Sequence, residues 1–206
     1  MLRDGYYESE VLNAIIQNLE PNGILWDVGG NIGLHAITAK AMRPGAEVLC
    51  FEPSPAIVGT LLCNNRLNGG GVSIVTAALS DRTGVQTLHV AGDGNTGIST
   101  LSPWPQVSYA SVVMVQAVEG DKLIGMGLPA PTVLKIDVEG HEKYVLRGMR
   151  QILSRASAVV FEDVPGASEA KSLLMDAGFL VTKLDRQEST AHDLENFVAL
   201  RPTPET

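Results

Sequence analysis

The chain contains few of the residues that define disulfide-rich or strongly aromatic proteins. Only 2 of its 206 residues are cysteines and 5% are aromatic, whereas 45% are hydrophobic and 18% are charged. This balance is typical of a globular protein and excludes a disordered one. Cys50 lies in a predicted strand and Cys63 in a predicted helix, so we expect both to be small core residues and not a disulfide pair.

Basic residues are also scarce. The chain has 15 lysines and arginines against 23 acidic residues, which gives a net charge of −8 and a pI near 4.9. A nucleic-acid-binding surface needs a basic stripe, and because none is visible no nucleic-acid partner is predicted. No apolar run approaches the roughly 18 residues that cross a bilayer, and the first residues lack the apolar core of a secretion signal. We expect a cytoplasmic protein without a membrane partner, and the sequence does not indicate an oligomeric state.

Helical and strand periodicities alternate along most of the chain. The length suits a single domain over residues 1–206, with a helical segment at 1–20. Strands separated by helices imply a mostly parallel α/β sheet with helices on both faces. The expected helices are Ser9–Leu19, Ile32–Met42, Pro55–Leu67, Glu142–Leu153 and Ala167–Ala177. The expected strands of the sheet are Ile24–Val28, Glu47–Phe51, Val72–Ala77, Thr132–Asp137, Ala158–Glu162, Phe179–Leu184 and Phe197–Arg201.

The middle of the chain has a different pattern. Val85–Val90 and Val112–Val118 each alternate apolar and polar residues, which predicts a small hairpin inserted at residues 85–118. The glycine-rich excursion between the two strands, Gly92–Tyr109, is long enough to be functional or mobile. Trp104, within this excursion, is a candidate for stacking on a sugar ring or for packing within the loop.

The segment from Ile24 to Gly33 is a strand, a glycine-rich turn and the start of a helix, an arrangement that can hold a nucleotide-like cofactor. A dinucleotide-binding turn would read Gly-x-Gly-x-x-Gly, but Asn31 stands where the middle glycine would be, and no Tyr-x-x-x-Lys pair occurs in the chain. The form Asp27-x-Gly29-x-x-x-Gly33 is typical of enzymes that use S-adenosylmethionine (SAM). An acid beside the turn can order the ammonium end of SAM, directly or through water. The alternative is a strand–turn–helix without a ligand.

Glu52 strengthens the cofactor prediction. It follows the second predicted strand, 23 residues after Gly29, where an acid can bind both hydroxyls of a ribose. Adenine often lies beside the residues after the third strand in this type of fold, which adds two more positions. The predicted cofactor residues are Asp27, Gly29, Asn31, Gly33, Glu52, Pro53, Ala78, Leu79 and Asp137.

Three motifs together resemble the FkbM-type methyltransferases. They are Asp27-Val-Gly-Gly-Asn-Ile-Gly33, Phe51-Glu-Pro-Ser-Pro55 and Leu134-Lys-Ile-Asp-Val-Glu-Gly-His-Glu142. The resemblance runs from about Tyr6 to Leu200, nearly the whole chain. It implies the Rossmann-like class I methyltransferase fold, with seven strands of which the last is antiparallel. It also implies SAM as methyl donor, S-adenosylhomocysteine (SAH) as product, and a hydroxyl acceptor on a small metabolite, sugar or natural product, as in secondary metabolism.

A hydroxyl acceptor must lose its proton, so a base or a positioning group is expected at the carboxyl ends of the middle strands. Asp137 ends the fourth strand and shares a face with Lys135, which makes it the first candidate, although it could instead cap the following turn. His141 is a second candidate because its ordinary pKa of about 6.5 suits a base, although it could equally face solvent. Glu162 is a third, because it ends the next strand at the same edge.

Two further points remain open at this stage. Carboxylates at this edge could bind a divalent metal that acidifies the hydroxyl, but the spacing does not demand one, and no metal is predicted. Glu139 and Glu142 lie near the first turn of a helix, where acids are either structural or functional.

The alternatives to a methyltransferase are an NAD(P)-dependent reductase and a SAM-binding subunit without chemistry of its own.

Overall fold

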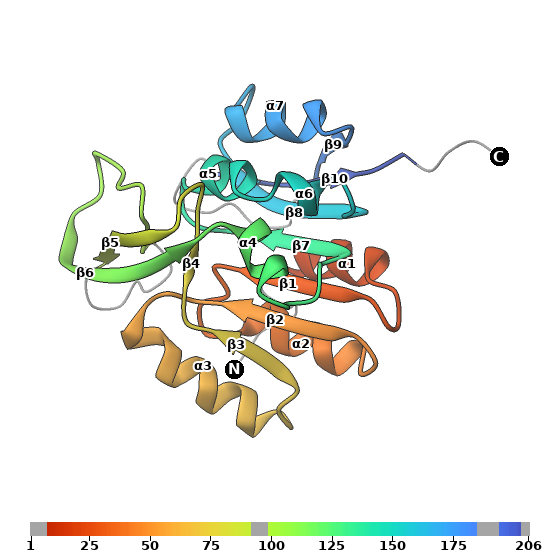
Figure 1. The fold of residues 1–206 in the computed structure, drawn as a ribbon, viewed down its shortest axis with the longest axis horizontal. Helices are drawn as coiled ribbons and strands as arrows, with labels where there is room; N and C mark the ends of the chain where they lie inside the picture. Colours follow the sequence, from red (N-terminus) through yellow and green to blue (C-terminus); the bar gives the residue numbers. More distant parts are fainter. Residues whose placement is uncertain (1–7, 92–98, 185–193, 203–206) are drawn as a thin grey trace.

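The computed structural model describes residues 8–91, 99–184 and 194–202 (Figure 1). A seven-stranded sheet with the order β3-β2-β1-β7-β8-β10-β9 forms its centre. The strands are β1 (Ile24–Val28), β2 (Glu47–Phe51), β3 (Val72–Val75), β7 (Val133–Ile136), β8 (Ala158–Asp163), β9 (Leu180–Lys183) and β10 (Glu195–Leu200). Strand β10 is antiparallel to both of its neighbours, and the other pairings are parallel. This confirms the predicted mostly parallel sheet with an antiparallel last strand.

Helices cover both faces of the sheet, because alternate residues of each strand point to opposite sides. One face packs against α1 (Ser9–Asn18), α2 (Leu34–Met42) and α3 (Pro55–Leu67). The other packs against α4 (Gly120–Gly125), α5 (Glu142–Arg147), α6 (Arg150–Leu153) and α7 (Glu169–Asp176). In β1, for example, Leu25 belongs to the first hydrophobic core and Trp26 to the second. The two cores hold the sheet rigidly from both sides.

The predicted hairpin is present and projects from one end of the molecule (Figure 1). It consists of β5 (Gly84–Ala91) and β6 (Tyr109–Val118), and residues 92–98 of the predicted excursion lie outside the described residues. A short strand that was not predicted, β4 (Ala78–Leu79), pairs in parallel with β6 and completes a three-stranded sheet.

The single helix predicted over Glu142–Leu153 is wrong, because the chain forms α5 and α6 with a break at Gly148. A Cβ atom at Gly148 would lie 2.0 Å from the carbonyl oxygen of Ser80, so the backbone of another segment passes directly against this glycine. The second helix has its own cap, since the Asp121 carboxylate accepts hydrogen bonds from the N–H groups of Gln151 and Ile152 at 2.9 and 3.0 Å. Contacts between distant segments therefore override the local helical pattern.

Both cysteines are free. Cys50 is buried in β2 as expected, but the expected burial of Cys63 is wrong, because it lies on the exposed side of α3. Among the residues that the structure describes, no helix has the length and apolar character needed to cross a membrane.

Candidate active site

Four parallel strands end at the same edge of the large sheet and carry the predicted polar residues. Val28 pairs with Phe51 on one side and with Ile136 on the other, and Ile136 pairs with Phe161, so the strands end nearly level. Ligands of open α/β sheets bind at this carboxyl edge. The structure brings to it Asp27, Glu52, Asp137 and Glu162.

The turn after β1 needs its glycines. Gly29 has a φ of 77°, and a Cβ atom there would lie 1.9 Å from the carbonyl oxygen of Asp137. Gly33 has a φ of 91°, and a Cβ atom there would lie 2.5 Å from Leu61. The Gly29 N–H donates to the carbonyl oxygen of Phe51 at 3.0 Å, which ties the turn to β2. The tight turn brings main-chain groups to the edge where a ligand would lie.

Asp27, at the base of this turn, is fully buried. Its Oδ2 accepts a hydrogen bond from the N–H of Ala36 in α2 at 3.1 Å, and its Oδ1 lies 3.3 Å from Nζ of Lys135. These contacts fix the start of α2 and the position of the lysine. A direct contact between Asp27 and a ligand ammonium stays a prediction.

Glu52 spans the gap between the turn and α3. Its Oε2 accepts the N–H of Asn31 at 3.0 Å, and its Oε1 accepts the N–H of Ser54 at 2.7 Å. Burial raises the pKa of Glu52, and these two backbone donors oppose the rise. Each carboxylate oxygen retains a second lone pair, so the group can accept further hydrogen bonds from a ligand.

Two polar atoms beside Glu52 are buried without a hydrogen-bond partner: Oδ1 of Asn31 and Oγ of Ser54. Ser54 directly precedes α3, where a serine hydroxyl commonly caps the helix, but its side chain makes no capping hydrogen bond. A buried unsatisfied polar atom costs about 1–3 kcal/mol. A polar ligand with hydroxyl groups at this place would satisfy both atoms.

Backbone strain gathers at the same edge. Among the described residues, the non-glycine residues with positive φ are Glu8, Asn31 and Glu139, at 52°, 49° and 55°. Glu8 precedes α1, Asn31 belongs to the glycine turn, and Glu139 lies in the loop after β7. Strained residues cluster at ligand sites because the surrounding structure holds them in place.

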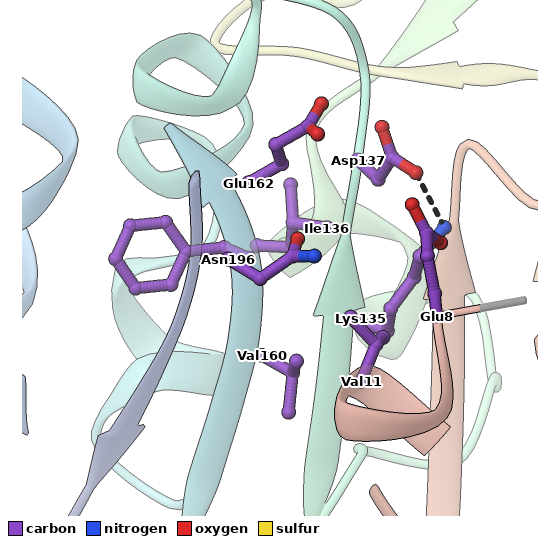
Figure 2. A pocket seen from close by; sticks show the side chains of 9 residues that line it. Glu8, Val11, Lys135, Ile136, Asp137, Val160, Glu162 and Asn196 are labelled. Atoms are coloured by element: carbon purple, nitrogen blue, oxygen red, sulfur yellow. Dashed lines mark ion pairs between the residues drawn. The ribbon is translucent and has the colours of Figure 1, made fainter. Parts of the chain in front are cut away.

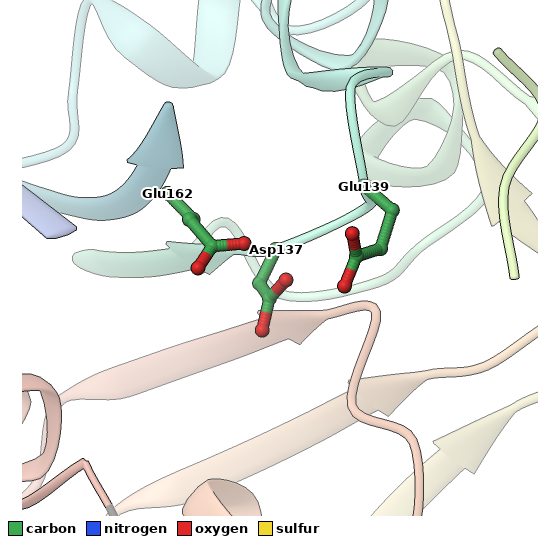
Figure 3. A group of neighbouring side chains, drawn as sticks. All are labelled: Asp137, Glu139 and Glu162. Carbon is green, nitrogen blue, oxygen red and sulfur yellow. The ribbon is translucent and has the colours of Figure 1, made fainter. Parts of the chain in front are cut away.

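Asp137, Glu139 and Glu162 form an acidic cluster (Figure 3). One carboxylate oxygen of each lies within 4.8 Å of the others. Burial, reinforced by the charge of Asp137, raises the pKa of Glu139 to about 8 and that of Glu162 to about 9. Such a group can share a proton or a cation, although acidic residues also gather without a metal, and their roles as catalytic groups stay predictions.

A pocket opens beside the cluster, between α1 and the ends of β7, β8 and β10 (Figure 2). Figure 2 shows the carboxylates at its upper side and aliphatic side chains below them. It is lined by Glu8, Val11, Lys135, Ile136, Asp137, Val160, Phe161, Glu162 and Asn196. The pocket therefore combines an apolar wall with several hydrogen-bond acceptors, as small-molecule sites commonly do.

Lys135 is only 4% exposed. Its Nζ lies 3.1 Å from Asp137 Oδ2 and 3.3 Å from Asp27 Oδ1, and it donates to the carbonyl oxygen of Gly29 at 3.4 Å. Burial alone would lower the pKa of Lys135, but the charges of Asp137, Asp27 and Glu8 outweigh it and hold the pKa above its ordinary value. The sequence placed this lysine on the same face as Asp137 without giving it a role. A lysine inside a buried strand was the available signal.

His141 is buried, and its predicted role as a base stays a prediction. It is 5% exposed, and both ring nitrogens are engaged, Nε2 with the hydroxyl of Ser80 at 2.9 Å and Nδ1 with that of Ser102 at 2.7 Å. Burial lowers its pKa to about 4. The ring therefore bridges β4 and the loop before β6 to the start of α5, and the expected alternative of a solvent-facing side chain is wrong.

Glu142 and Trp104, whose roles the sequence left open, both make contacts within the protein. Glu142 accepts the N–H groups of Val138 and Gly140, both at 3.1 Å, and so closes the loop after β7. Trp104 donates from Nε1 to the carbonyl oxygen of Glu139 at 3.0 Å and packs on Gly140. The predicted adenine neighbours Ala78 and Leu79 are buried in β4, and Pro53 is half-buried beside Glu52.

Solved structures share this fold. The precorrin-6y C5,15-methyltransferase from Geobacter metallireducens GS-15 superposes with a TM-score of 0.59, covering 98% of this chain and 93% of that chain at 14% identity. At that identity the likeness concerns the fold alone. Together with the sheet order and the glycine turn, it defines the Rossmann-like fold of the class I methyltransferases.

Sequence comparison identifies the family. The methyltransferase FkbM domain matches residues 27–187. The hexuronic acid methyltransferase AglP from Haloferax volcanii is 32% identical over 195 residues, covering 91% of this chain and 77% of that protein. The 31-O-demethyl-FK506 methyltransferase FkbM from Streptomyces tacrolimicus is 28% identical over 198 residues, covering 79% and 75%. The chain belongs to the FkbM methyltransferase family, which confirms the resemblance and favours methyl transfer over the reductase alternative.

Proposed function

We propose that this chain is a SAM-dependent O-methyltransferase that acts on a hydroxyl group of a small metabolite, sugar or natural product. Family membership supports methyl transfer. The name of one relative, the 31-O-demethyl-FK506 methyltransferase, supports a hydroxyl acceptor. The observation that carries the proposal is that Asn31 and Ser54, whose backbone N–H groups both donate to Glu52, also carry buried side-chain oxygens without a hydrogen-bond partner.

The residues at the cofactor end fit SAM. Glu52 has free lone pairs for the two ribose hydroxyls, and Asn31 and Ser54 have polar atoms that need a partner. Gly29 and Gly33 bring the main chain close enough for the methionine part, with Asp27 below the turn. Pro53, Ala78 and Leu79 are the proposed neighbours of the adenine. When bound, SAM supplies a methyl group on a sulfonium that leaves as a neutral thioether.

The pocket next to this site is the proposed place of the acceptor. As the acceptor oxygen gains the methyl group it must lose its proton, and a carboxylate within reach can hold that proton. Asp137 and Glu162 both line the pocket, from adjacent strands. Asp137 is fixed by Lys135, so we assign it the orientation of the hydroxyl, while Glu162 shares the proton within the acidic cluster.

Calorimetry on the pure protein with SAH and with NADH tests the cofactor assignment. SAH should bind and NADH should not, and the reverse result would return the chain to the reductase alternative. A panel of hydroxylated sugars and metabolites, incubated with SAM that carries a radiolabelled methyl group, then tests the reaction. Binding of SAH with no transfer to any hydroxyl, but transfer to an amine, would overturn the O-methyl assignment.

A further inference from the structure

Lys135 lies between the two halves of the site. Its strand, β7, pairs with β1, and Asp27 is its direct register partner across the sheet. The main chains also meet, since the Asp137 N–H donates to the carbonyl oxygen of Val28 at 3.0 Å. The lysine side chain adds a second connection, because its ammonium contacts both the carbonyl oxygen of Gly29 in the turn after β1 and the Asp137 carboxylate at the pocket.

The ammonium group has three N–H donors, and three acceptors surround it. These are Asp137 Oδ2, Asp27 Oδ1 and the carbonyl oxygen of Gly29, at 3.1, 3.3 and 3.4 Å. Nζ donates a hydrogen bond to the Gly29 carbonyl oxygen and lies at ion-pair distance from both carboxylates, so its near neighbours are groups of the protein. The lysine acts on other groups of the protein, which distinguishes a positioning role from a catalytic one.

Stability alone does not explain a charge at this place. Taking an ammonium out of water costs several kcal/mol, and well-packed apolar residues often replace buried ion pairs at no loss of stability. An apolar side chain could fill the volume, but it could not hold the Asp137 carboxylate and the Gly29 carbonyl oxygen at a fixed distance from each other. The lysine ammonium can do so because it contacts both groups.

We propose that Lys135 is a positioning residue that sets the Asp137 carboxylate relative to the methyl donor, by tying it to the carbonyl oxygen of Gly29 in the cofactor turn. The proposal rests on the proposed function for the identity of the donor. It predicts that ligand binding at the turn changes the environment of the Lys135 ammonium. It also predicts that loss of the lysine weakens cofactor binding, although the ammonium contacts groups of the protein.

The first experiment uses the wild-type protein labelled with ¹⁵N-lysine. A buried ammonium with three acceptors exchanges its protons slowly, so the Lys135 side-chain signal should be visible at neutral pH and can be assigned through its own carbons. Saturating SAH should shift it. The control is Lys143, which is 39% exposed in its side chain and pairs with Glu169 on α7. A Lys135 signal that does not move when SAH binds would overturn the proposal.

The second experiment compares variants by calorimetry with SAH. Lys135→Met should weaken SAH binding about tenfold or more, while Lys143→Met should bind as the wild type does. Since Lys135→Met leaves the buried Asp27 and the partly exposed Asp137 without this counterion, the same change is also made in an Asp27→Asn background, where a folding defect is less severe. Asp27→Asn/Lys135→Met has one fewer uncompensated charge and is compared with Asp27→Asn alone. SAH affinities within twofold in that pair would show that the lysine is only a counterion.

The outcomes separate this proposal from the function on which it rests. Wild-type protein that binds no SAH would overturn the proposed function. Wild-type protein that binds SAH, with lysine variants that bind it equally well, would overturn only the role of Lys135.

Discussion

The proposed cofactor end and the proposed acceptor end of the site hold their carboxylates in opposite ways. Glu52 accepts two backbone N–H groups, which oppose the effect of burial on its pKa. Within the described part of the chain, Glu139 and Glu162 receive no such donors, and burial and the neighbouring carboxylates raise the pKa of both. One end is therefore suited to accepting fixed hydrogen bonds from a ligand, and the other to gaining and losing a proton.

The largest expected effect is at the acceptor end. Asp137→Asn keeps the shape of the side chain but removes its charge, so methyl transfer should fall by about 10²-fold or more while SAH binding changes by less than about tenfold. Rates with radiolabelled SAM and calorimetry with SAH measure the two quantities. Asp176→Asn, at the exposed end of α7, is the control. Transfer at the wild-type rate would remove Asp137 from the mechanism.

At the cofactor end the expected effect is on binding. Glu52→Ala removes the proposed ribose acceptors and leaves two backbone donors unpaired, so SAH affinity should fall roughly 30- to 100-fold, the equivalent of about 2–3 kcal/mol. Glu47→Ala, at the exposed start of the strand that precedes Glu52, should bind as the wild type does. Equal affinities in these two variants would break the contrast between the two ends.

A pH series tests the acidic cluster. An acid whose pKa is higher in the folded state than in the unfolded state binds extra protons on folding, so stability falls as the pH rises from about 4.5 towards about 9 for Glu162. Glu162→Gln removes this loss. Its unfolding temperature should match that of the wild type near pH 5 and exceed it near pH 8.5, by about 2 °C or more if the gain is ~1 kcal/mol. A difference in unfolding temperature that stays the same at both pH values, or an equal gain in Glu47→Gln, would contradict the raised pKa of Glu162.

The smallest catalytic effect is expected at His141. Because Ser80 and Ser102 occupy both ring nitrogens, His141→Ala should lower the unfolding temperature, by about 2–4 °C per kcal/mol lost, and reduce methyl transfer by less than about tenfold. The pH dependence of the rate should keep its shape. A loss of transfer above about 100-fold at an unchanged unfolding temperature would restore the histidine as a catalytic base.

The sheet and the turn could be predicted from sequence because their signals are local. Apolar periodicity gives the strands and helices, and Gly29 and Gly33 mark a turn whose sterics exclude side chains. The break between α5 and α6 could not be predicted, since it depends on Ser80, 68 positions before Gly148 (148 − 80). The bridge between His141 and its two serines has the same origin. No periodicity records which distant segment will pass beside a given residue.

The candidate site also combines features that have a local sequence signal with features that depend on contacts between distant segments. The place of Glu52 at the carboxyl edge could be predicted because it directly follows the second strand, whereas the unpartnered state of the Ser54 hydroxyl depends on side-chain geometry. Lys135 was visible as a charged residue in an apolar strand, but its three partners come from two strands and a turn. The sequence indicated which polar residues gather at this edge and did not reveal which contacts hold them.

The left-handed backbone at Glu8, Asn31 and Glu139 limits how far this protein can be stabilised by engineering. Glycine at each position would relieve strain of order 1 kcal/mol. The same change would delete a carboxylate at the pocket, an amide beside Glu52, or a member of the acidic cluster. A more heat-resistant version is therefore best sought in the helices and the hairpin, away from the three places where rigidity and ligand contact compete.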